Sequence, residues 1–71
     1  MYRIIYLNDH LVYKNFESDN YNTIADQHMY LKKCGCKIIC LIDYKSNVIL
    51  NRCPDYKSHI QEINKYVYNS R

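Results

Sequence analysis

Turn-forming residues divide the apolar segments of the chain into two similar halves. In the first half, residues 2–7 and 11–16 are rich in Ile, Val, Tyr and Phe, and Asn8, Asp9 and His10 separate them. Because Asn and Asp tolerate left-handed backbone angles, this pattern predicts a β-hairpin. Apolar side chains alternate onto both faces of the first strand, so the periodicity does not say which face is buried.

A helix is predicted to follow this hairpin. The polar segment 17–22 contains several good N-cap residues, and an apolar stripe then follows at the spacing of one helical face. The stripe consists of Tyr21, Ile24, His28 and Leu31. Lys32 and Lys33 suit the negative end of the helix dipole. Gly35, the single glycine of the chain, stands where a left-handed C-cap is needed.

The second half repeats this order with stronger strand signals. Residues 37–44 and 48–53 are predicted strands, and Lys45-Ser46-Asn47 joins them. A three-residue loop with Asn47 in the left-handed position pairs Tyr44 with Val48. One face of the hairpin is then almost wholly apolar: Cys36, Ile38, Cys40, Ile42, Tyr44, Val48 and Leu50. A two-residue loop, which would pair Cys40 with Cys53, mixes the faces and is less favoured.

The last predicted helix opens at Pro54 and Asp55. Its apolar stripe consists of Tyr56, Ile60, Ile63 and Val67. The order ββαββα indicates one α+β domain over residues 1–71, with an antiparallel sheet of two hairpins and both helices on one face. The other face of the sheet would be bare, and for this reason we expect a homodimer.

The amino-acid composition indicates the kind of genome that encodes the chain and where the protein is located. Tyr, Asn, Ile and Lys fill nearly half of the 71 positions, and Gly, Ala and Pro are almost absent. These biases follow AT-rich codons, which is typical of a phage, a large DNA virus or a low-GC bacterium. No apolar run is long enough to span a membrane, and the start lacks the apolar core of a signal peptide. We therefore expect a cytoplasmic protein with free thiols.

The cysteines and histidines do not form a recognisable catalytic or metal motif. There is no C-x2-C pair, and Cys36 and Cys40 would lie about 13 Å apart on one strand at roughly 3.3 Å per residue. We read both as small buried hydrophobes. His59 neighbours Ile60 and is expected to face solvent. We therefore expect no catalytic residue, no metal and no cofactor.

Protein binding is the leading functional hypothesis. Nine tyrosines cannot all fit into the core of a 71-residue chain, and exposed tyrosines bring a large contact area at little entropic cost. The expected partner-binding residues are Tyr6, Tyr13, Tyr30 and Tyr44. We interpret the chain as a non-catalytic accessory protein of a phage or virus. It would inhibit a host enzyme or defence complex, as anti-CRISPR proteins do.

Nucleic-acid binding is the alternative. The net charge is only +3, but Lys32, Lys33 and Lys37 cluster near the end of the first helix, and Arg52 lies on the second hairpin. Such a binder would lose affinity steeply with added salt. Isolated lysines also simply keep a small domain soluble, so this hypothesis ranks second.

Overall fold

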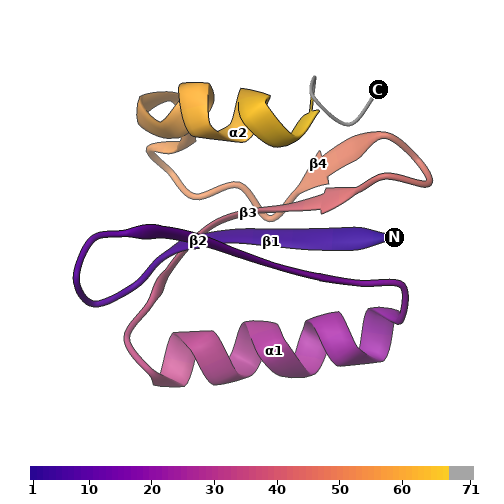
Figure 1. Cartoon of the computed structure of the whole chain (residues 1–71), viewed down its shortest axis with the longest axis horizontal. Coiled ribbons are helices and arrows are strands. Elements are labelled where there is room, and N and C mark those ends of the chain that lie inside the picture. Colours follow the sequence, from indigo (N-terminus) through magenta and orange to yellow (C-terminus); the bar gives the residue numbers. More distant parts are fainter. Residues whose placement is uncertain (68–71) are drawn as a thin grey trace.

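The computed structural model describes residues 1–67. A four-stranded antiparallel sheet with the strand order β2-β1-β3-β4 lies between two helices (Figure 1). The elements are β1 (Tyr2–Leu7), β2 (Tyr13–Ser18), α1 (Tyr21–Lys33), β3 (Lys37–Asp43), β4 (Val48–Leu50), the 3-10 turn η1 (Tyr56–His59) and α2 (Ile60–Val67). The predicted α+β class and the element order ββαββα are confirmed.

The two helices lie on opposite faces of the sheet (Figure 1), so the expectation that both cover one face is wrong. The cause is the double-sided apolar pattern of β1. Ile4 and Ile5 are both 0% exposed. Ile4 packs with Ile24 and Leu31 of α1, whereas Ile5 packs with Ile63 of α2. Consecutive strand residues point to opposite faces, so burying both requires a helix on each side.

A β-bulge in β3 breaks the single apolar face expected for the second hairpin. The pairing of β1 with β3 shifts between Ile5 and Tyr6, which face Cys40 and Ile38, so Ile39 is the extra residue. On the N-terminal side of the bulge, Cys36 and Ile38 pack towards α1. After it, the residues that pack towards α2 are Cys40, Ile42 and Tyr44.

The β3–β4 loop is one residue longer than predicted. Asp43 pairs with Val48, so residues 44–47 form the loop, and the predicted pairing of Tyr44 with Val48 is wrong. The Asp43 carboxylate accepts hydrogen bonds from the backbone N–H groups of Lys45 (3.0 Å) and Ser46 (3.3 Å), which stabilises the longer turn. The left-handed conformation of Asn47 is confirmed at φ 57°.

The first hairpin shows the same effect of a side chain on loop length. The bounds of β1 match the prediction, but β2 begins at Tyr13, two residues later than expected. The Asn8 side-chain oxygen accepts hydrogen bonds from the N–H groups of His10 (2.9 Å) and Val12 (3.0 Å). Leu11 adopts a left-handed φ of 59° within this five-residue loop.

Both ends of α1 follow from capping. The Asn20 side chain accepts a hydrogen bond from the N–H of Asn22 (2.8 Å) at the first turn. At the last turn the N–H of Cys36 donates a hydrogen bond to the Leu31 carbonyl (3.0 Å), and the N–H of Gly35 donates one to the Lys32 carbonyl. These two bonds form a Schellman motif around Gly35, whose φ of 81° confirms the predicted left-handed cap.

The C-terminal helical segment differs from the predicted stripe. It starts with η1 and only then continues as α2. Ile60 is 40% exposed, and Tyr66 packs against the core in its place, together with Tyr56 and Val67. The stripe therefore turns at the junction between the 3-10 and α-helical parts, which have different numbers of residues per turn.

Because α2 covers the second sheet face, the ground for expecting a homodimer is removed, and the dimer stays a prediction. Within residues 1–67 no helix is long and apolar enough to cross a membrane.

Replacing Gly35 by Ala tests the helix cap. No atom lies within 4 Å of the added Cβ, so the cost arises from the backbone alone. A left-handed conformation costs a non-glycine residue about 1–2 kcal/mol, and we expect the free energy of unfolding in urea to fall by about that amount. Asn47→Gly is the matched control: it relieves a left-handed residue and should leave the stability equal or higher. Equal stability of Gly35→Ala and the parent would contradict this account of the cap.

Candidate functional site

The four predicted partner-binding tyrosines do not share one surface. Tyr30 is well exposed on α1, and Tyr6 is half-buried against the α1-side core. Tyr13 lies at the start of β2, and its hydroxyl is 2.6 Å from Nδ1 of His59. Tyr44 is half-buried on the α2 side. Their roles as a binding set stay a prediction.

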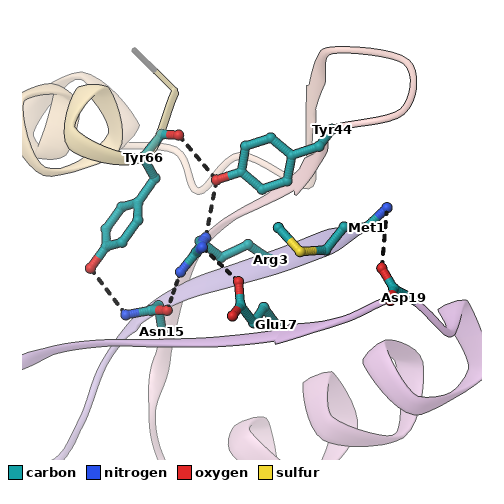
Figure 2. A network of polar contacts seen from close by, with 7 residues as sticks. All are labelled: Met1, Arg3, Asn15, Glu17, Asp19, Tyr44 and Tyr66. Carbon is teal, nitrogen blue, oxygen red and sulfur yellow. Dashed lines mark hydrogen bonds and ion pairs between the residues drawn. The ribbon is translucent and has the colours of Figure 1, made fainter. Parts of the chain in front are cut away.

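Arg3 accounts for the position of Tyr44 (Figure 2). Its guanidinium donates hydrogen bonds to the Tyr44 hydroxyl (3.0 Å), to Glu17 (2.7 Å) and to the side-chain oxygen of Asn15. The Tyr44 hydroxyl in turn donates to the backbone carbonyl of Tyr66 (3.0 Å). The guanidinium also lies 4.7 Å from the centre of the Tyr66 ring. This network connects α2 and the β3–β4 loop to β1 and β2. The Tyr44 hydroxyl is therefore hydrogen-bonded within the domain.

The four cations of the nucleic-acid hypothesis are separated by the fold. Lys32 and Arg52 line the same cavity, and Lys33 is exposed but does not line it. The ammonium group of Lys37 lies 2.6 Å from Oδ2 of Asp55 in an ion pair. Only two of the four positive charges therefore face a common concave surface.

Two adjoining cavities run beside α1 and share His28 and Asn51. We call them together the α1 groove. The apolar half, with a volume of about 180 Å³, is further lined by Tyr21, Ile24, Ala25, Met29 and Leu41. The basic half, with a volume of about 400 Å³, is further lined by Lys32, Cys36, Ile38, Arg52, Cys53 and Pro54.

The groove exists because α1 does not reach across the whole sheet. The helix packs on β1, β2 and β3, which leaves the same face of β4 open. Leu50 pairs directly with Leu41 and so shares its face of the sheet, as Val48 also does. Both Leu50 and Val48 are exposed, so this face of β4 carries uncovered apolar surface, although neither residue lines the groove itself.

The electrostatics of the groove are one-sided. Lys32 and Arg52 supply positive charge, and within residues 1–67 no acidic side chain lines the groove. Burial, and then the charge of Lys32, lower the pKa of His28 below its usual 6.5, so His28 is neutral at pH 7. Arg52 is held with its guanidinium 5.1 Å from the centre of the Tyr56 ring. The groove therefore suits a ligand that is apolar at one end and acidic at the other.

A second feature lies where the chain leaves β4. Cys53, Asp55 and His59 place a thiol, a carboxylate and an imidazole within 4.8 Å of one another. We call these three residues the Cys-Asp-His cluster. The expectation that His59 faces solvent is wrong, because its side chain is only 11% exposed. The sequence signal that was missed is the spacing C-x-D-x3-H, which contains one cysteine and so escapes a search for cysteine pairs.

The protonation states of the cluster argue against a cysteine nucleophile. Hydrogen bonds from Lys37, and then from Cys53, hold the pKa of Asp55 well below its ordinary value. Burial, and then the hydrogen bond to Asp55, raise the pKa of Cys53. Nucleophilic catalysis by cysteine needs a thiolate, which a raised pKa disfavours. Burial likewise raises the pKa of Cys40 to about 12, in line with its reading as a small buried hydrophobe.

Comparisons with known proteins do not assign the chain to a class. No family model, curated protein or solved structure matches it. The α1 groove and the Cys-Asp-His cluster are therefore the two features from which function can be inferred.

The lowered pKa of His28 predicts a pH dependence of stability. Below about pH 6.5 the unfolded chain binds a proton at His28 more readily than the folded chain does. The free energy of unfolding should therefore fall as the pH drops through 6.5 towards the folded-state pKa. In urea titrations at about pH 7.5 and about pH 5.5, His28→Gln should lose less stability on acidification than the parent. An identical loss in both proteins would show that His28 is not shielded by the groove.

Proposed function

We propose that this chain is a non-catalytic binding protein that holds a segment of a partner protein in the α1 groove. The observation that carries the proposal is the division of the groove into an apolar half and a basic half. Met29 offers exposed apolar surface in the half that the buried Leu41 also lines, and Lys32 and Arg52 line the other half. The matching partner segment carries apolar side chains followed by one or two acidic residues.

The apolar half is the reason to favour a protein over a nucleic acid. Met29 is 59% exposed although it is a large apolar side chain. Methionine adapts its shape to apolar partners and is frequent on peptide-binding surfaces. Proteins bind the phosphate backbone of a nucleic acid through lysine and arginine side chains instead. Two cations at one end of a groove are few for a dedicated nucleic-acid binder.

The composition supports the biological setting that we propose. A tyrosine-rich chain of 71 residues, whose composition is biased towards amino acids with AT-rich codons, fits a phage or viral accessory protein acting in the host cytoplasm. Occupying a surface of a host enzyme or defence complex requires binding without chemistry, which is what the groove offers. Tyr30 directly follows Met29 on α1 and is also well exposed, so it is the predicted tyrosine that best suits this surface.

Capture of partners from host lysate by tagged protein, with nuclease added, tests the function. We expect a discrete protein to be retained by the parent and to be reduced at least about tenfold by Met29→Asp, which removes apolar contact worth more than about 1.4 kcal/mol. Arg52→Glu should weaken capture of the same protein by removing charge complementarity. Both residues are exposed, and circular dichroism would confirm that the variants are folded.

Matched controls separate groove binding from general stickiness. Lys33→Glu makes the same change of charge as Arg52→Glu outside the groove, and Val12→Asp removes an exposed apolar residue on the β1–β2 loop. Both controls should retain the partner. Recovery that disappears with nuclease, or controls that are as damaging as the groove variants, would contradict the proposal and favour the nucleic-acid alternative.

A further inference from the structure

We propose that the Cys-Asp-His cluster is a binding site for a zinc ion. The inference does not need the proposed function to be right, because Asp55 and His59 lie outside the α1 groove and only Cys53 also lines its basic half. One sulfur, one oxygen and one nitrogen ligand atom converge there, from Cys53, Asp55 and His59. These are the three kinds of ligand atom that zinc takes in proteins.

The distances fit a tetrahedral ion. Oδ2 of Asp55 and Nε2 of His59 are 3.4 Å apart. Two ligands of a tetrahedral zinc with bonds of about 2.0–2.1 Å lie roughly 3.3 Å apart, so this edge of the site already has the required length. The Cys53 sulfur lies within 4.8 Å of a ligand atom of each of the other two residues, and a zinc–sulfur bond of about 2.3 Å requires the sulfur to move towards them.

His59 is oriented as a metal-binding histidine is. Its Nδ1 is 2.6 Å from the Tyr13 hydroxyl, and the two rings meet edge to face at 5.7 Å. Nε2 is buried and has no hydrogen-bond partner within residues 1–67. In the tautomer that carries the ring proton on Nδ1 and donates it to the Tyr13 hydroxyl, Nε2 presents its lone pair to Asp55 and Cys53. A ligand histidine typically donates its second N–H to such an outer partner, which fixes the tautomer.

The backbone holds the three ligands in place. The N–H of Cys53 donates to the Ile39 carbonyl (2.9 Å), which fixes Cys53 against β3. The N–H of Tyr56 then donates to the Cys53 carbonyl (3.1 Å), and η1 brings His59 back over Asp55. All three ligands therefore come from one short turn of chain that is anchored to the sheet, and little ordering is left for the ion to impose.

Lys37 competes with the ion. Its ammonium group lies 2.6 Å from Oδ2 of Asp55, so it holds positive charge at one of the proposed ligand atoms. Both side chains are 46% exposed, and the flexible lysine can turn into solvent when a divalent ion takes its place. Cys53 is a thiol in the metal-free chain, and zinc would displace its proton on binding. Thiolate and imidazole ligands favour zinc over magnesium or calcium, which prefer oxygen ligands. Three protein ligands leave a fourth position for water.

Titration of the metal-free full chain with Zn²⁺ by calorimetry, and with Co²⁺ by absorption spectroscopy, tests the site. We expect one ion per chain and a thiolate-to-cobalt charge-transfer band. His59→Gln should weaken zinc binding at least tenfold, and Tyr13→Phe, which removes the outer partner of His59, by about 10–100-fold. Lys37→Met should tighten binding, because the competing ammonium group is gone.

The controls use the other histidines and cysteines. His10→Gln and Cys34→Ser remove exposed metal-binding groups outside the cluster and should leave the zinc affinity unchanged. Because Cys53 is buried in the core, its replacement can unfold the chain, so the test relies on the exposed or partly exposed positions. Absence of zinc binding, an unchanged affinity in His59→Gln, or weaker binding in Lys37→Met would overturn the proposal.

Discussion

Two neighbouring residues of the central strand, Ile4 and Ile5, are completely buried on opposite faces of the sheet. Each buried isoleucine side chain contributes about 1.5–3 kcal/mol of hydrophobic stabilisation. This is large compared with the net free energy of unfolding of a domain of this size. If either face of the sheet were exposed to solvent, the stabilisation from burying one of these two isoleucines would be lost. Residues 1–67 contain two α-helices, so each face receives one, and this division fixes the rest of the architecture.

Covering each face with a single helix leaves part of the sheet open. On one face α1 packs mainly on β1, β2 and β3, Val48 and Leu50 of β4 stay exposed, and the α1 groove lies beside the helix. On the other face the short helix α2 is held by the Arg3 network through the Tyr66 carbonyl (Figure 2). The Cys-Asp-His cluster lies on the connection that carries the chain from β4 to α2. Both candidate sites are thus consequences of how two helices are shared between two faces.

Local rules predict the type and order of the elements but only some of their bounds, and they are insufficient to predict the assembly. The bounds of β1 and the cap at Gly35 follow from residues close in sequence. The bulge at Ile39 and the four-residue loop after Asp43 depend on pairing and on a side-chain hydrogen bond, which the apolar pattern does not encode. The prediction for the helix faces is wrong because the apolar pattern of β1 is double-sided.

The candidate sites are harder to predict than the elements. Lys32 and Arg52 are recognisable as cations in the sequence, but their common groove arises only when α1 is placed beside the segment after β4. The burial of His59 depends on Tyr13, which is 46 residues earlier in the chain. Contacts between residues so far apart in the sequence are set by the tertiary fold, and no local spacing of residues predicts them.

Methyl-to-methyl nuclear Overhauser effects would test the division of the helices most directly. If the helices lie on opposite faces, contacts are expected from Ile24 and Leu31 to Ile4 and from Ile63 to Ile5, with no cross-peak between Ile63 and Ile24. Contacts of Ile63 with Ile4 and Ile24 would place both helices on one face. That result would contradict the fold and would remove the α1 groove with it.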